Sequence, residues 1–334
     1  MEAETVTRER PNRAGRKERF RRRTFLRTAA VAGTAVGVGR ASASQADGDT
    51  GFPPSGTTTY GAEIELGNGS ARPFTTETPS GEPKYHGVEI DLAALDGLPD
   101  ADELQASGED RYTDKYSSTG EALRIHRKWA LEFFVEFPDS EATPFTFLGL
   151  NWNPNGHPGG GGAWEVPHFD IHFHMLAMET IDAIEGPRLP PYDEITERDG
   201  SGVPTEIESE LAAEQLPEGY VRPPPPVADE RYITDMGEHT APRDAPELPA
   251  DPDEFTNTLI QGFAATGSGE HPELAFIEPM TTKEFLEGVS GTESYEIAQP
   301  SAYPHDKHHP TEYSVRDLPS EDAIAVAIQA FEEI

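Results

Sequence analysis

Seven residues near the middle of the chain combine a strand-like pattern with side chains that can bind metal ions. From position 168 to 174 the order His-Phe-Asp-Ile-His-Phe-His alternates polar and apolar residues without a break, and a period of two predicts a β-strand. One face would carry Phe169, Ile171 and Phe173, and the other would carry His168, Asp170, His172 and His174. Imidazole and carboxylate are the ligands that divalent zinc, iron, manganese or copper accepts when no thiolate is available.

The spacing along a strand limits which of these side chains can share one ion. Residues two apart have Cα atoms about 6.5 Å apart and residues four apart about 13 Å, whereas metal–nitrogen bonds are about 2.0–2.1 Å long. Asp170 with His172, or His172 with His174, can therefore reach one ion together. His168 and His172 cannot, unless a bulge or strong twist brings them closer. His172 is the central candidate ligand, and further ligands must come from elsewhere in the chain.

A second interpretation of the same strand needs no metal. Alternating histidines can line a polar, hydrogen-bonded interior or a contact between subunits, with Asp170 fixing the tautomer of an imidazole. A loop rich in Gly and Pro precedes the strand at residues 153–162 and contains His157. His157 could close over a site, but its neighbours favour a role in a turn.

The composition indicates an acidic, ordered protein without thiol chemistry. The chain has 26 Lys or Arg and 61 Asp or Glu, of which residues 1–43 contain 11 and 4. Residues 44–334 therefore have 15 basic and 57 acidic residues, a net charge of −42. This excess would repel nucleic acid, and its spread along the chain is typical of a protein kept soluble in high salt, so we expect a halophilic source. The absence of cysteine excludes disulfides and thiolate ligands.

The N-terminal segment has the organisation of a targeting signal. Arg22 and Arg23 fit the twin-arginine pattern, a mildly apolar run follows at residues 28–39, and Ala41-Ser-Ala43 offers a cleavage site. The apolar run is too short for a stable transmembrane helix. The sequence therefore predicts a twin-arginine signal peptide at residues 1–43 and a mature protein that is extracellular or in the cell envelope, with no membrane span.

The remainder is predicted to form one mainly β domain. Residues 44–59 are small and polar and are expected to be a flexible leader, and residues 60–334 contain short alternating segments separated by Gly- and Pro-rich turns. The fold class expected is an antiparallel sheet or barrel-like single domain with short helices and long loops. Residues 122–137 are predicted to form one strand, residues 255–263 and 273–277 a strand pair, and residues 323–331 a strand. Residues 186–230, acidic and rich in Pro, are expected to run over the surface.

Several motifs give the chain a resemblance to the TTHB210-like family, also described as the DUF5602 domain, from about Gly67 to the C-terminus. The motifs are Gly67-Asn-Gly-Ser-Ala-Arg72, Gly97-Leu-Pro99, Trp152-Asn-Pro-Asn-Gly-His-Pro158, Val166-Pro-His-Phe-Asp-Ile-His-Phe173, Met236-Gly-Glu-His239, Phe276-Ile-Glu-Pro-Met280, Gln299-Pro300, Tyr303 and Pro310-Thr-Glu-Tyr313. The family is essentially uncharacterised. The resemblance implies a mainly β fold and a ring-like homo-oligomer.

The resemblance also ranks the candidate ligands. Thr240 follows the Met-Gly-x-His unit where the family has an aromatic residue, and His174 stands where an aromatic residue is usual. These differences favour His168, Asp170, His172 and His239 as site residues over His174 and Glu238. Glu278, in another matched motif, is a possible acid or base, or else an ordinary acidic surface residue before a turn.

Three functions follow from these observations. The leading hypothesis is an exported metalloprotein with a divalent transition metal (Zn, Fe, Mn or Cu), whose candidate ligands are His168, Asp170, His172, His174 and His239. The second is a non-enzymatic envelope homo-oligomer whose histidine face is buried polar structure or subunit interface. The third is a cupin-like metal-dependent oxygenase or isomerase, for which His172, His174, Glu179 and His239 can be fitted, although the glycine spacing of cupins is absent.

Overall fold

The computed structural model of the chain describes ten segments, all of them inside the unit that spans Val38–Ile334. The segments are residues 51–106, 123–126, 130–138, 140–157, 162–184, 214–222, 232–233, 235–248, 254–264 and 272–334. The predicted signal peptide and its cleavage site lie outside these residues. Within these segments, no helix has the length and apolar character needed to cross a membrane.

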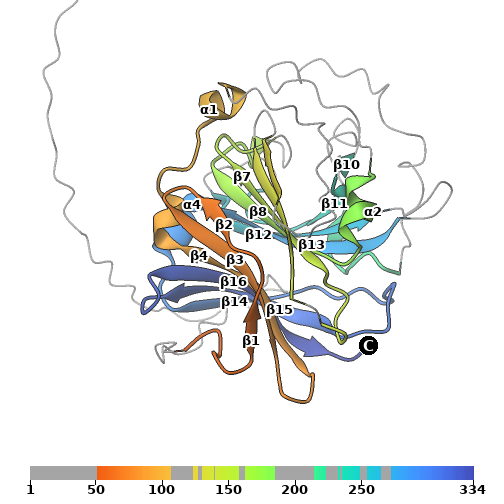
Figure 1. Cartoon of the computed structure of the whole chain (residues 1–334). Helices are drawn as coiled ribbons and strands as arrows, with labels where there is room; N and C mark the ends of the chain where they lie inside the picture. The colour runs from red at the N-terminus through yellow and green to blue at the C-terminus, as the bar shows by residue number, and fades with distance from the viewer. Residues whose placement is uncertain are drawn as a thin grey trace, which may run out of the picture. The chain divides into compact units, whose positions relative to one another are not determined.

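The fold is mainly β, as the sequence predicted, with 48% of the described residues in strands and 10% in helices. The strands form two antiparallel sheets (Figure 1). The first sheet has the order β1-β3-β4-β16-β15-β14, with β2 paired to β3. Its strands are β1 (Thr58–Tyr60), β2 (Ile64–Leu66), β3 (Gly69–Glu77), β4 (Pro83–Asp91), β14 (Thr292–Glu296), β15 (His309–Leu318) and β16 (Ala323–Glu332).

The second sheet has the order β10-β11-β12-β13-β8-β7-β6-β5, with β9 paired to β11. Its strands are β5 (Leu123–His126), β6 (Leu131–Glu136), β7 (Phe147–Asn153), β8 (His168–His174), β9 (Tyr220–Val221), β10 (Tyr232–Ile233), β11 (Gly237–Pro242), β12 (Asn257–Ala264) and β13 (Glu273–Thr282). The described strands thus lie in two sheets with separate edge strands, and the barrel-like alternative is not confirmed. Short helices connect them: η1 (Leu92–Leu95), α1 (Ala101–Ala106), α2 (Met178–Asp182) and α4 (Lys283–Gly288).

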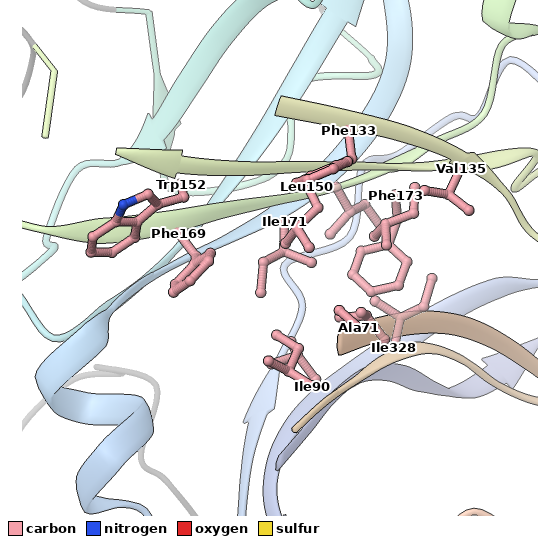
Figure 2. Packing of buried hydrophobic residues seen from close by; sticks show 14 of the residues in the cluster. Ala71, Ile90, Phe133, Val135, Leu150, Trp152, Phe169, Ile171, Phe173 and Ile328 are labelled. Carbon is pink, nitrogen blue, oxygen red and sulfur yellow. The ribbon is translucent and has the colours of Figure 1, made fainter. Parts of the chain in front are cut away.

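The main hydrophobic core joins side chains of the two sheets. Phe169, Ile171 and Phe173 of β8 belong to the same buried cluster as Ile90 of β4 and Ile328 of β16 (Figure 2). Because each fully buried side chain of this size contributes about 1.5–3 kcal/mol relative to an exposed one, this apolar face fixes the register of β8. A slip by one residue would turn the imidazoles into the core.

The opposite face of β8 is buried as well. A second cluster, which includes Trp164, Ile181, Phe255 and Phe276, covers that side of the sheet, and all seven residues of β8 are buried. The predicted strand and its alternation are confirmed, but its polar face lies in the interior. Four titratable side chains are therefore held where burial penalises charge.

Two boundaries predicted from the sequence are wrong. Residues 122–137 contain two antiparallel strands, in which Leu123 of β5 pairs with Phe134 of β6. Alternation does not reveal a reversal of the chain, although strands are usually about 5–6 residues long, which argues against one strand of sixteen. Ordered structure also begins inside the predicted leader, where Phe52 is buried and β1 pairs with β3.

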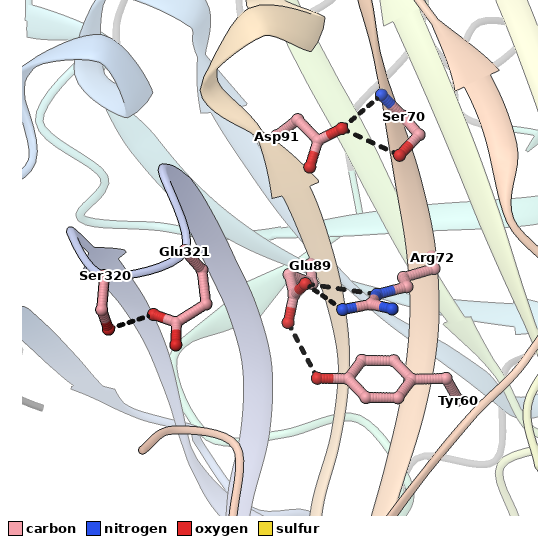
Figure 3. A network of polar contacts seen from close by, with 7 residues as sticks. All are labelled: Tyr60, Ser70, Arg72, Glu89, Asp91, Ser320 and Glu321. Atoms are coloured by element: carbon pink, nitrogen blue, oxygen red, sulfur yellow. Dashed lines mark hydrogen bonds and ion pairs between the residues drawn. The ribbon is translucent and has the colours of Figure 1, made fainter. Parts of the chain in front are cut away.

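A polar network on the first sheet explains why β1 is held in place. Glu89 accepts hydrogen bonds from Arg72 Nη2 at 2.6 Å and from Tyr60 Oη at 2.9 Å (Figure 3). The Arg72 guanidinium lies 3.8 Å from the centre of the Tyr60 ring. Burial and the hydrogen bond to Glu89 raise the pKa of Tyr60 to about 12, so the hydroxyl remains a donor. The network joins β1, β3 and β4.

The acidic, Pro-rich excursion includes one packed segment among its described residues. Tyr220 of β9 is buried, and its hydroxyl donates a hydrogen bond to the Leu259 carbonyl at 2.8 Å. Pairing of Val221 with Ala241 adds β9 to the sheet beside β11. Residues 214–222 are therefore part of the fold, whereas residues 185–213 and 223–230 lie outside the described segments.

Candidate metal centre

The register of the second sheet sets the surroundings of the β8 side chains. Asp170 lies opposite Asn151 of β7 on one side and Met280 of β13 on the other. His172 lies opposite Gly149 of β7, and the pairing of Ile277 with Phe173 and of Met280 with Asp170 places Glu278 opposite His172. Polar side chains of adjacent strands therefore meet on the buried face. Glu132 of β6, paired with Asn151, extends this row, and the sequence interpretation did not identify it.

Three side chains near the start of β8 form what we call the Asp170 cluster: His157, His168 and Asp170. Their candidate ligand atoms all lie within 4.8 Å of one another. Asp170 Oδ1 is 3.0 Å from His168 Nε2, and Asp170 Oδ2 is 3.6 Å from His157 Nε2. Asn153 Nδ2 donates a hydrogen bond to Asp170 Oδ2 at 2.8 Å. The loop that precedes β8 supplies His157, whose backbone N–H donates to the Trp164 carbonyl at 3.2 Å.

Three others form the Glu278 cluster: His172, His239 and Glu278. Their candidate ligand atoms also lie within 4.8 Å of one another. Glu278 Oε1 is 3.4 Å from His172 Nε2, and Glu278 Oε2 is 3.5 Å from His239 Nε2. His239 belongs to β11 and reaches Glu278 of β13 across β12. Gly262 of β12 pairs with His239 and leaves the space that the Phe276 ring fills, because a Cβ there would lie 1.8 Å from that ring.

The backbone orients one imidazole of each cluster. His168 Nδ1 lies 2.7 Å from the Val166 carbonyl oxygen, and His239 Nδ1 lies 3.2 Å from the Gly237 carbonyl oxygen. A carbonyl only accepts hydrogen bonds, so Nδ1 carries the proton in each ring. In a neutral ring the lone pair is then on Nε2, which faces the carboxylate. Metal-binding histidines are held in this way, with the second ring nitrogen donating to a carbonyl or carboxylate.

A nitrogen lone pair and a carboxylate oxygen are both hydrogen-bond acceptors, so they repel each other when they face each other directly. The 3.0 Å contact between His168 Nε2 and Asp170 Oδ1 is not a directed hydrogen bond, and within the described residues both atoms are buried without a hydrogen-bond partner. Glu278 Oε2 is likewise buried without one in that part of the chain. A proton or a cation between nitrogen and oxygen would relieve the repulsion of two acceptors.

The two carboxylates differ in their electrostatics. Burial raises the pKa of Asp170, but the neighbouring His168 and His157 outweigh it and hold that pKa well below its usual range. The pKa of Glu278 is raised well above its usual range, first by burial and second by the negative charge of Asp170. Without a cation, Asp170 is therefore held ionised beside the two imidazoles, whereas Glu278 is held protonated.

The predicted ligands are brought together in a different combination from the one that spacing favoured. His168 joins Asp170, and His172 joins His239, so Asp170 and His172 belong to separate clusters. The prediction that His168 and His172 do not share an ion agrees with this grouping. His157, assigned to a turn, is a cluster member, and Glu278 is a buried strand residue rather than an acidic surface residue.

His174 belongs to neither of the two clusters. Its ring stacks on Phe147, with centroids 4.3 Å apart at an interplanar angle of 12°, and on His172 at 5.3 Å. Burial, with smaller contributions from His172 and His239, lowers the pKa of His174 well below its usual value. His174 therefore packs as a neutral aromatic ring. The set required by a cupin-like site is also not assembled, since Glu179 is exposed on α2.

One member of each cluster was not assigned as a ligand from the sequence: Glu278 in one and His157 in the other. Glu278 alternates with Phe276 and Met280 in an apolar segment, which marks it as a carboxylate that a strand carries inward. The position of His157 depends on the path of a Gly- and Pro-rich loop, which no periodicity reveals. The buried His, Asp and Glu groups could hold metal ions, and three protein ligands are the number found in zinc sites that keep a position for water or substrate.

Comparisons of the chain with protein-family models, with curated proteins and with solved structures found no match.

Proposed function

We propose that this chain is an exported protein that binds a divalent transition metal on the buried face of its second sheet. The observation that carries the proposal is the orientation of the imidazoles. Backbone carbonyls hold His168 and His239 with Nε2 directed at a carboxylate, which is the arrangement that metal-binding histidines adopt. Zinc, iron, manganese or copper accepts such ligands, and availability decides among them.

The proposed export and family membership rest on sequence motifs. The twin-arginine pattern at Arg22 and Arg23 supports transport in the folded state to the cell envelope or the exterior. The motifs around residues 166–173 and 236–239 support membership of the TTHB210-like family, and with it a homo-oligomer. A bound ion with an open coordination position would polarise a carbonyl group or activate water, so hydrolytic or oxygenase activity is compatible with the site.

The alternative is a non-enzymatic envelope protein whose histidine face is structural. The stacking of His174 on the rings of Phe147 and His172 favours it for that residue. It predicts that chelators leave stability unchanged. The metal-binding proposal predicts that a chelator lowers the melting temperature, because an ion that binds only the folded state stabilises it.

Elemental analysis by plasma mass spectrometry tests the proposal. The parent protein, purified without an affinity tag, is compared with Glu278→Gln, which keeps the shape of the side chain but cannot ionise to a carboxylate. His308→Ala is the control, because His308 is partly exposed and its Nδ1 contacts only the Ala142 carbonyl in the described structure. We expect near-stoichiometric metal in the parent and the control, and less in Glu278→Gln. A metal-free parent that remains folded contradicts the proposal.

A further inference from the structure

The clusters around Asp170 and Glu278 divide the candidate ligands into two complete and separate sets. Each set has one carboxylate, one buried imidazole from β8 and one imidazole from another segment. The third member is partly exposed in both, with 18% of the His157 side chain and 13% of the His239 side chain accessible. The two sets share no residue. Each therefore has one member that solvent reaches.

The orientation of the carboxylates decides between separate ions and a bridged pair. In a bridged site, each of the two oxygens of a carboxylate faces a different ion. Asp170 instead directs Oδ1 to His168 and Oδ2 to His157, and Glu278 directs Oε1 to His172 and Oε2 to His239. Both oxygens of each carboxylate thus point to imidazoles of the same cluster. The geometry lacks the bridging carboxylate that holds paired ions about 3.5–4 Å apart.

The contacts of β8 lead to the same conclusion. Asp170 and His172 are neighbours on one face, and strand residues two apart, with Cα atoms about 6.5 Å apart, could share one ion. His172 Nε2 instead lies 3.4 Å from Glu278 Oε1, whereas Asp170 faces His168 and His157. Each buried carboxylate lies between two imidazoles of its own cluster, so each cluster offers three ligands to an ion of its own.

We infer that the chain binds two divalent transition-metal ions in two independent mononuclear sites, one formed by His157, His168 and Asp170 and the other by His172, His239 and Glu278. This rests on the proposed metal binding and adds the number of ions, their ligands and their independence. His157 and Glu278 thereby become ligands, and His174 does not.

Two near-isosteric substitutions separate the sites. Asp170→Asn keeps an oxygen for Asn153 to donate to, and Glu278→Gln keeps the length of its side chain. The full-length protein, both single variants and the double variant are loaded with Co²⁺, freed of excess ion by gel filtration and analysed for cobalt per chain. We expect two ions in the parent, about one in each single variant and none in the double variant. The visible spectra of the two single variants should add up to that of the parent.

Each other result has a distinct meaning. A parent with one ion that either substitution removes has a single shared site, which overturns this inference while the proposed metal binding stands. Loss of both ions in either single variant indicates a coupled pair and overturns it as well. A parent without cobalt overturns the proposed function itself. Circular dichroism and the melting temperature of each variant establish whether a variant that has lost metal is still folded. His157→Ala provides a second test of the Asp170 site, because His157 is a ligand from a loop.

Discussion

At the scale of single residues, the contacts of each ring explain why the imidazoles of this protein have different roles. His168 and His239 are fixed through Nδ1 by backbone carbonyls, so each presents Nε2 to a carboxylate. Within the described residues His174 has no hydrogen-bond partner at either ring nitrogen and is held by stacking alone. Side chains of one type on one strand are thus distinguished by their contacts and not by their spacing.

His174→Phe tests this distinction. Phe keeps the stacking on Phe147 and removes two buried polar atoms that lack partners. Because such atoms cost about 1–3 kcal/mol, we expect the free energy of unfolding to rise by about 1 kcal/mol and the metal content to stay at that of the parent. Chemical denaturation and elemental analysis measure the two quantities. Loss of metal in His174→Phe would make His174 a ligand and contradict the assignment.

His86 provides a prediction on pH that is independent of the metal sites. It is a buried residue of β4 whose ring lies between the hydroxyls of Thr75 and Thr143, and burial lowers its pKa to about 3. The unfolded chain takes up a proton near the ordinary pKa of about 6.5 and the folded chain does not. The contribution of His86 to stability is therefore complete above pH 6.5 and is lost as the pH falls from 6.5 towards 3.

The comparison with His86→Gln isolates this effect, because other titrating groups are common to both proteins. The stability advantage of the parent should fall by about 1.4 kcal/mol for each pH unit within that window. Urea denaturation at several pH values between 7 and 4 measures it. A difference in the free energy of unfolding that does not change with pH would mean that His86 has the same pKa in the folded and the unfolded protein.

At the scale of strands and loops, close contact between β12 and β13 positions the Glu278 cluster. Gly262→Ala is the direct test, since the new methyl group would lie 1.8 Å from the Phe276 ring. Overpacking of this kind costs about 3 kcal/mol or more, so we expect a markedly lower melting temperature and a lower metal content. Gly288→Ala is the matched control, because a Cβ there meets nothing within 4 Å. Equal stability of the two variants would exclude this role for Gly262.

The sequence was sufficient for those elements whose periodicity reflects burial. It predicted β8, the pair β12 and β13, and β16, because each has one face or both in a core. It could not reveal the reversal between β5 and β6, since alternation continues through a hairpin. It also could not group the ligands, because strand pairing, and not sequence distance, brings His239 within 3.5 Å of Glu278.

At the scale of the whole molecule, the main constraint is negative charge. Residues 44–334 have 57 acidic and 15 basic residues, and mutual repulsion of these charges destabilises the compact state at low salt. The described interior is not acidic in the same way, because its hydrophobic clusters are apolar. The surface charge and the metal clusters should therefore respond to salt separately.

Salt concentration tests the proposed adaptation. Raising the ionic strength from 0.1 M to 1 M shortens the screening length from about 10 Å to about 3 Å. We expect the melting temperature to rise by several degrees over this range while the metal content of the protein stays constant. Differential scanning calorimetry measures the first quantity. A melting temperature that is independent of salt would show that the acidic surface is not adapted to high ionic strength.

The central claim is that metal ions lie on the buried face of the second sheet, and anomalous X-ray diffraction tests it most directly. Data collected above and below the absorption edge of the metal found by elemental analysis locate each ion without assumptions about its ligands. We predict two anomalous peaks per chain, one among His157, His168 and Asp170 and one among His172, His239 and Glu278. Crystals of metal-loaded protein that diffract well and have no peak at either cluster would contradict this account, and the histidine face would then be structural.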